Sequence, residues 1–221
     1  MLDYLKQSFT PVDDRADALL EEACNYINRI HRVKGISTCA FHYAEIRGSV
    51  HGEHYQGEEI VVSTKTQFPV LAAIHELGHA IDGVFLNSAQ GFGTPDDPYP
   101  SFGSELAEKD VTTLLGHRLA AVSASTYCRS LKRALAERSL AAGQAQEILK
   151  LLGVRECWAR SYEMFVAYRN PGTALARQMD VERGLWTQIG GVVVHNYWQR
   201  DDFEEVEVCI VRIFEKLQWL M

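Results

Sequence analysis

The sequence predicts a single α+β domain in which a small mixed β-sheet is followed by a series of helices. Segments with the composition of strands are concentrated between residues 36 and 64, and strong helix formers dominate from residue 104 to residue 152. The chain has 221 residues, of which 47% are hydrophobic and 23% are charged, so it can bury one sizeable core. We therefore expect residues 1–221 to form one globular unit.

A first helix is predicted near the N-terminus. Asp13 and Asp14 can cap it, because aspartate side chains accept hydrogen bonds from the free N–H groups of a first helical turn. The helix should continue to about Arg32, and Gly35 should end it. Its apolar residues recur at helical spacing: Leu19, Leu20, Ala23, Ile27 and Ile30.

Three strand-like segments follow, at residues 36–46, 50–56 and 59–64, and the third is the clearest. His51 and His54 lie three residues apart in the second segment, so on a strand they would face opposite sides and could not share a metal ion. A solvated hairpin is therefore favoured over a metal site. Two isolated histidines are assigned core or surface roles: His31 and His42.

A buried helix is predicted to begin at Pro69, which suits a first helical turn. The residues that follow are mostly apolar and unbranched, and Gly83 suits a C-terminal cap. Near its end lies Asp82, for which a charge at the helix terminus is favoured over a role in orienting a metal ligand.

This helix carries the motif His75-Glu76-Leu77-Gly78-His79. Residues four apart on a helix lie on the same face, so the imidazoles of His75 and His79 can bind one metal ion. Glu76 lies about 100° around the helix from His75. Its carboxylate can therefore reach a water on the metal without coordinating the ion, which is the geometry of a general base. The motif predicts a catalytic Zn²⁺ site.

A long loop and several packing helices are predicted next. Residues 87–103 are dominated by glycine, proline and aspartate, and they form either a flap over the site or a plain connector. Residues 104–152 should form two or three helices, with breaks near Tyr127 and at Gly143.

Catalytic zinc usually has three protein ligands, so a third residue must join the two histidines. No histidine follows six residues beyond His79, where the chain has Phe85. Residues 155–168 predict a later helix on which Glu156 and Glu163 share one stripe, and either could be the ligand. The alternative is a solvated face on which these glutamates pair with nearby arginines: Arg155, Arg160 or Arg169.

The C-terminal segment is predicted to contain a last strand and a last helix. Residues 192–194 are three valines that can supply the strand. Asp201 or Asp202 can cap a helix that continues to Trp219.

The two motif-bearing segments, HELGHAID from His75 and ECWARSYE from Glu156, resemble the gluzincin metallopeptidases. More narrowly, they are similar to the group that includes the anthrax lethal factor catalytic domain and the minigluzincin domains of phage and conjugative-element polyvalent proteins. In that family the first glutamate of the second helix is the third zinc ligand. The resemblance implies a zincin-like fold and zinc-dependent peptide hydrolysis, with His75, His79 and Glu156 as ligands and Glu76 as the general base. Cys157 departs from the family pattern, which has an aromatic residue there.

The resemblance implies further roles. Glu163 would lie outside the ligand shell or at the surface, and residues 104–152 would be a helical insertion. The last strand before the metal helix would be an edge that pairs with an extended peptide, an ordinary core strand being the alternative. The family stabilises the oxyanion with a tyrosine or histidine, for which Tyr99, His195 and Tyr197 are candidates, and packing roles are favoured for all three.

Composition excludes several other classes. A net charge of −7 without a long basic run argues against nucleic-acid binding, and a peptide or protein is the expected partner. The five cysteines include no Cys-x-x-Cys pair and should be reduced, buried thiols. Without a signal peptide or an apolar run of membrane-spanning length, the expected location is the cytoplasm, although delivery by a specialised secretion or conjugation system would leave no such signal.

Two alternative functions remain. A deformylase would use the same histidine pair with a cysteine from a Glu-Gly-Cys turn, and this tripeptide does not occur. A non-enzymatic metal-binding interaction protein would keep the fold but use the cleft for recognition.

Overall fold

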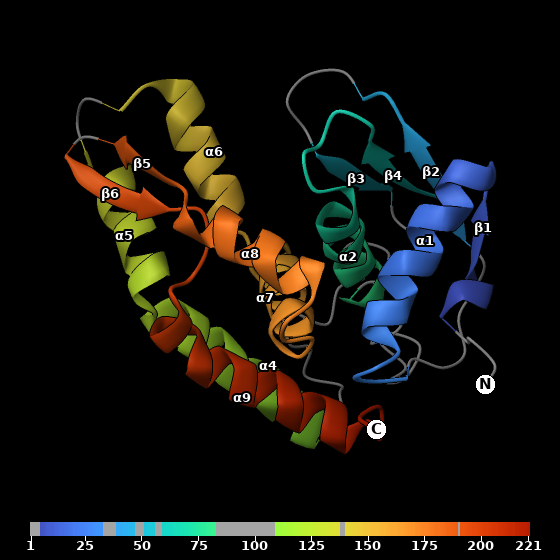
Figure 1. The fold of residues 1–221 in the computed structure, drawn as a ribbon. Helices are drawn as coiled ribbons and strands as arrows, with labels where there is room; N and C mark the ends of the chain where they lie inside the picture. Colours follow the sequence, from blue (N-terminus) through green and yellow to red (C-terminus); the bar gives the residue numbers. More distant parts are fainter. Residues whose placement is uncertain are drawn as a thin grey trace.

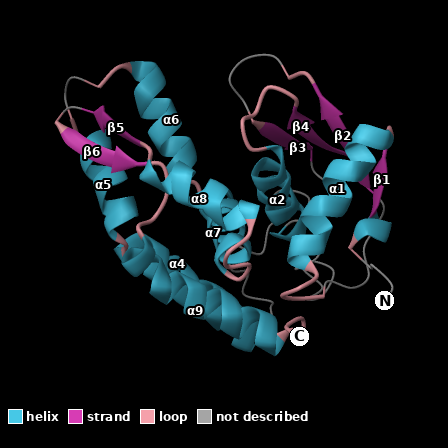
Figure 2. Cartoon of the chain, viewed as in Figure 1, coloured by secondary structure: helices cyan, strands magenta, loops and turns pink. Residues whose placement is uncertain are grey.

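A computed structural model of the chain has both helices and a mixed sheet, which confirms the α+β class (Figures 1 and 2). It describes residues 5–32, 39–46, 51–55, 59–82, 109–137, 140–189 and 191–221. We call residues 5–82 the N-terminal half and residues 109–221 the C-terminal half. The predicted loop 87–103, with Tyr99, and the predicted cap Gly83 lie outside the described residues.

The N-terminal half contains one four-stranded sheet, in the order β1-β2-β4-β3. Its strands are β1 (Phe9–Pro11), β2 (Cys39–Ala44), β3 (Gly52–Tyr55) and β4 (Glu59–Ser63). β2 pairs in parallel with β1 and β4, and β3 pairs antiparallel with β4. The three predicted strands are confirmed, whereas β1 was not predicted.

Of the two roles considered for the last strand before residue 69, edge strand or ordinary core strand, the structure shows the core strand. Among the described strands, β4 is an inner strand, and β1 and the short strand β3 form the two free edges of the sheet. The burial pattern explains this, because Ile60 and Val62 of β4 are fully buried, whereas β3 contains Glu53 and the exposed Tyr55. Short strands with charged residues are typical of sheet edges.

Helix α1 (Asp14–Ile27) begins as predicted, since the Asp13 side chain accepts a hydrogen bond of 2.8 Å from Ala16 N. Its predicted extension to Arg32 is wrong. The residues after Ile27 turn away to pair with the C-terminal tail, where Arg32 N donates to Trp219 O over 2.7 Å. The buried apolar face is the predicted one: Leu19, Leu20, Ala23 and Ile27.

Three of the described histidines outside the motif have the structural roles that were expected. His31 is fully buried and lies 2.8 Å from the Tyr162 hydroxyl through Nε2, while His42 forms a partly exposed pair with Glu59 over 3.1 Å. His51 is exposed at the start of the β3–β4 hairpin, with its Nδ1 3.1 Å from the Thr66 hydroxyl.

Helix α2 (Pro69–Ala80), which carries the His-Glu-x-x-His motif, packs against α1, β3 and β4, and it starts at Pro69 as predicted. Helix α7 (Val154–Tyr168) is the predicted glutamate helix and packs closely against α2. Trp158 Nε1 donates a hydrogen bond of 3.0 Å to Gly78 O across this contact. A Cβ atom at Gly78 would lie only 3.2 Å from Ala159 Cα. Glycine therefore permits the close approach of the two helices.

The rest of the C-terminal half is mainly helical. Helices α4 (Lys109–Ala124), α5 (Thr126–Leu135) and α6 (Ala142–Leu152) occupy the described part of the predicted helical region 104–152. The predicted break near Tyr127 falls at Ser125, which caps α5, whereas Gly143 lies within the first turn of α6 instead of at a break. In Figure 1, α4 runs alongside α9 (Arg200–Lys216).

The predicted capping of the last helix is wrong. Gln199 is the N-cap of α9, and Asp201 and Asp202 lie in its first turn. Asp202 instead accepts hydrogen bonds from Thr126 N and Tyr127 N, so it satisfies the first N–H groups of α5. The valine segment forms β6 (Val192–His195) as predicted, but its antiparallel partner β5 (Trp186–Ile189) and the preceding α8 (Ala174–Gly184) were not predicted.

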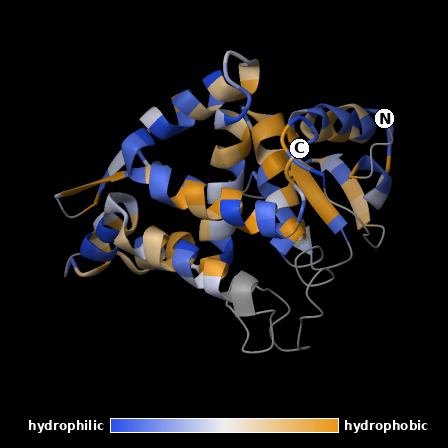
Figure 3. Ribbon diagram, turned by 90° about the horizontal axis from the view of Figure 1, so that it is seen from below, coloured by the Kyte–Doolittle hydropathy of each residue, from blue (hydrophilic) through white to orange (hydrophobic). Residues whose placement is uncertain are grey.

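The core extends through both halves. Figure 3 shows hydrophilic and hydrophobic colours alternating along the outer helices, as expected when each helix buries one face. All five cysteines are free and buried, as predicted. Within the described ranges, no helix has both the length and the apolar character that crossing a membrane requires.

Candidate metal centre

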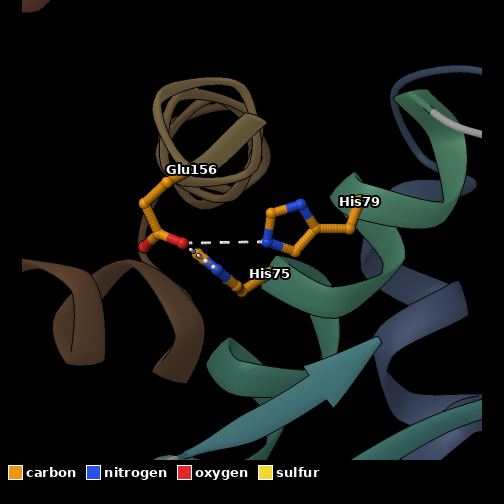
Figure 4. A group of neighbouring side chains, drawn as sticks. All are labelled: His75, His79 and Glu156. Carbon is orange, nitrogen blue, oxygen red and sulfur yellow. Dashed lines mark ion pairs between the residues drawn. The ribbon is translucent and has the colours of Figure 1, made fainter. Parts of the chain in front are cut away.

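Two helices bring together three side chains of the types that bind metal ions (Figure 4). α2 provides His75 and His79, and α7 provides Glu156. Glu156 Oε2 lies 3.7 Å from His75 Nε2 and 3.8 Å from His79 Nε2. The three potential ligand atoms lie within 4.8 Å of one another. Among the residues that the structure describes, no other group of three histidine, cysteine or acidic side chains converges in this way.

The spacing of these atoms suits a zinc ion. Zinc bonds to nitrogen and oxygen of about 2.0–2.1 Å in a tetrahedron place the ligand atoms about 3.3 Å apart. The observed separations of 3.7 and 3.8 Å exceed this value by a few tenths of an ångström. Two imidazoles and one carboxylate are also a common donor set of catalytic zinc, and they leave a fourth position free.

Glu156 is held by Arg160, one helical turn later. Arg160 Nε donates a hydrogen bond of 2.7 Å to Glu156 Oε1, and Arg160 Nη1 donates to Asn196 O over 2.5 Å. The guanidinium also lies over the Tyr197 ring, 4.8 Å from its centroid. The Glu156 side chain is only 12% exposed, so the alternative of a solvated face is wrong for this residue. Arg160 therefore binds the Oε1 atom of Glu156, while the Oε2 atom faces His75 and His79.

Glu163 lies behind His75. Its Oε2 is 3.1 Å from His75 Nδ1 and accepts a hydrogen bond of 2.7 Å from the Tyr197 hydroxyl. The Glu163 side chain is 3% exposed, so a surface position is excluded. A carboxylate at Nδ1 fixes the ring so that Nε2 can bind a metal. Glu163 is therefore placed to orient His75: it contacts Nδ1 of the ring, whereas Glu156 faces Nε2.

The other candidates for oxyanion stabilisation are placed differently. Tyr197 lines the site, but its hydroxyl donates to Glu163. His195 lines the same cleft, and within the described chain its buried Nδ1 has no hydrogen-bond partner. Asp82, just beyond the end of α2, is fully buried, and its charge opposes the lowering of the Arg118 pKa by burial.

Glu76 is 5% exposed and faces the edge strand β3. Burial raises the pKa of its carboxyl to about 7, although the charge of His75 lowers it. Burial also lowers the pKa of His75, but the charge of Glu156 and the hydrogen bonds with Glu156 and Glu163 outweigh this effect and raise the pKa to about 10. Burial raises the pKa of Glu156, but His75 and Arg160 hold it well below its usual range.

Comparisons with models of protein families, with curated proteins and with solved structures found no match.

The site opens into a cleft of about 990 Å³ between the two halves. Residues of β3, α2, α6, α7 and the β5–β6 hairpin line it, and they include all three potential ligands and Glu76.

The sequence alone did not indicate Gly52, which contacts Glu76, or the role of Tyr197. It did contain a signal for the pair Glu156–Arg160, since opposite charges four residues apart on a helix commonly pair.

Zinc binding should release close to one proton per chain near neutral pH. His75 has a pKa of about 10 in the metal-free protein, so its imidazole is charged there, whereas a zinc ligand must be neutral. The apparent zinc affinity should therefore rise with pH up to about 10. The raised pKa also stabilises the folded metal-free protein below pH 6.5, and this stabilisation is lost as the pH rises through about 10. Calorimetric titration in buffers of different ionisation enthalpy measures the proton release, and a pH-independent affinity would contradict the prediction.

Replacing Gly78 by alanine should separate α2 from α7. The added Cβ would lie 3.0 Å from Tyr162 Cδ1 and 3.2 Å from Ala159 Cα, and backbone cannot move aside as a side-chain tip can. We expect a loss of about 1–3 kcal/mol in unfolding free energy and weaker zinc binding. Gly116→Ala is the control, because this helical glycine has no neighbouring atom within 4 Å of the added Cβ. Urea unfolding and zinc titration of both variants provide the test, and equal stabilities would show that the contact tolerates a methyl group.

Proposed function

We propose that this protein is a zinc-dependent endopeptidase with a zincin-like fold. The observation that carries the proposal is the convergence of His75, His79 and Glu156 in a cleft beside a buried glutamate and the free edge of a sheet. The motif spacing, the carboxylate at His75 Nδ1, and the separations of 3.7 and 3.8 Å between Glu156 Oε2 and the two imidazoles support it.

In this proposal His75, His79 and Glu156 would hold Zn²⁺, which would supply Lewis-acid activation of water and of the scissile carbonyl. Glu76 accepts a proton from the attacking water on its carboxylate and later donates it to the leaving amine. A carboxyl with a pKa near 7 can both accept and donate a proton at neutral pH, and burial raises the pKa of Glu76 to about 7. Glu163 holds the imidazole of His75 in the required orientation, and Arg160 does the same for Glu156.

The edge strand β3 offers a binding surface for an extended peptide. Ser63 N donates to His51 O over 2.8 Å, and hydrogen-bonded pairs alternate with non-bonded pairs along antiparallel strands. With Gly52 opposite Val62, residues 52 and 54 fall at the non-bonded positions. Their backbone N–H and C=O groups therefore point away from β4, toward the free edge. We propose that the substrate adds to this edge as a further strand.

The proposal is tested with purified protein loaded with zinc and incubated with a diverse peptide mixture, in which mass spectrometry detects new termini. We expect one zinc ion per chain and internal cleavage that a chelator abolishes and added zinc restores. Zinc-loaded, folded protein that cleaves none of the peptides would favour the alternative of a non-enzymatic metal-binding interaction protein. Folded protein that binds no zinc would contradict both readings.

A further inference from the structure

Among the described glycines, Gly52 has the least room for a side chain, because Glu76 lies against it. A Cβ atom built on Gly52 would lie 2.6 Å from Glu76 Oε1, 2.7 Å from Glu76 Cγ and 3.0 Å from Glu76 Cδ. Carbon atoms that are not bonded to each other attract at about 3.5–4.0 Å and repel strongly at shorter distances. The outer part of the Glu76 side chain therefore occupies the space that any other residue at position 52 would fill.

The backbone of Gly52 does not itself require glycine. The two described glycines with a positive φ are Gly172 and Gly191, at 75° and 85°, whereas Gly52 belongs to a regular strand paired with Val62. Glycine weakens a strand, because it lacks a side chain to pack and loses more conformational freedom on folding than other residues. Glycine at position 52 therefore lowers the local stability of β3. The space taken by Glu76 explains why a glycine is found there despite this loss.

Glu76 has few alternative positions. Its side chain is buried, so the atoms packed around it leave little free space into which the carboxylate can move. A methyl group at position 52 would nevertheless displace only a flexible side chain and no backbone. The fold should tolerate this shift. A general base should not tolerate it, because it must lie within hydrogen-bond reach of the proton it accepts.

We infer that Gly52 is a positioning residue for the general base: its missing side chain lets the Glu76 carboxylate lie against the strand that binds the substrate. The inference rests on the proposed function. In that function, the contact sets the carboxylate beside the peptide-binding edge, in the cleft that the three potential ligands also line. Gly52 acts only through Glu76 and takes no part in proton transfer.

The first test compares Gly52→Ala with Gly143→Ala, a glycine whose added Cβ would have no neighbouring atom within 4 Å. We expect Gly52→Ala to lower kcat about 100-fold, as a misplacement of about 1 Å can do, with little change in KM or zinc stoichiometry. Gly143→Ala should keep the wild-type kcat. An unchanged kcat in Gly52→Ala would overturn the inference and leave the proposed function intact.

The second test uses the metal-free protein and needs no substrate. Thermal unfolding is measured for the wild type, Gly52→Ala, Glu76→Ala and the double variant. Gly52→Ala should raise Tm more in the Glu76→Ala background, where the carboxylate is gone, than in the wild type. Equal effects in the two backgrounds would show that the residues do not compete for space and would overturn the inference. Wild type that binds zinc but cleaves no peptide would contradict the proposed function, whereas this coupling would still report the contact.

Discussion

Replacing Glu76 by glutamine should lower kcat about 1,000-fold and leave zinc binding unchanged. Glutamine has nearly the same shape as glutamate but cannot accept the proton of the attacking water, and a general base typically contributes about 10²–10⁴-fold to the rate. Glu76 is not among the three converging ligand atoms, so the zinc content should stay at one per chain. Peptide turnover and elemental mass spectrometry on the same samples measure the two quantities.

Glu22→Gln is the matched control for this substitution, since Glu22 is exposed on α1, outside the cleft. It should keep the wild-type rate. A Glu76→Gln variant with retained turnover would exclude the proposed mechanism, whereas loss of zinc together with activity would show that Glu76 supports the metal.

Replacing Glu156 by alanine should weaken zinc binding on the order of 100- to 1,000-fold. Structural zinc sites bind with about 10–16 kcal/mol, so one of four ligands represents about 3–4 kcal/mol. The substitution also leaves Arg160 without the carboxylate that it contacts at 2.7 Å, which adds an unpaired buried charge. Competition with a chromophoric chelator measures the affinity.

Glu163→Ala separates the two glutamates. Because Glu163 contacts His75 Nδ1, its removal should weaken zinc binding by only about 10- to 100-fold, the usual effect of losing a group that orients a ligand. The expected order of zinc affinity is wild type, then Glu163→Ala, then Glu156→Ala. The reverse order of the two variants would make Glu163 the third ligand.

The sequence predicted those features of the site that depend on local geometry. His75 and His79 share a face because both lie on one helix, whose start at Pro69 the sequence also indicated. The helix that carries Glu156 followed from its composition, while the choice of Glu156 over Glu163 came from the family resemblance. The structure places Glu156 beside both histidines and Glu163 beside His75 Nδ1.

The features that the sequence did not predict depend on contacts between distant segments. All three strand-like segments form strands, yet nothing local indicates that β4 pairs with both β2 and β3 and leaves β3 at the edge. Asp202 has the sequence context of a helix cap, but it caps α5, which starts 76 residues earlier. α1 ends before Arg32 because the tail near Trp219 pairs there. The contact between Gly52 and Glu76 likewise depends on the sheet order.

The close contact between α2 and α7 has a mechanical consequence. The two halves meet along this contact and also where residues 30–32 pair with the C-terminal tail, and the side chains of His75, His79 and Glu156 extend from α2 and α7. If one half rotated against the other about this junction, each atom would move in proportion to its distance from the axis. The hairpin β5–β6 and the edge strand β3 would then move far, and the three ligand atoms would move little. Such a rotation would change the width of the cleft and leave the spacing of the three potential ligand atoms nearly unchanged.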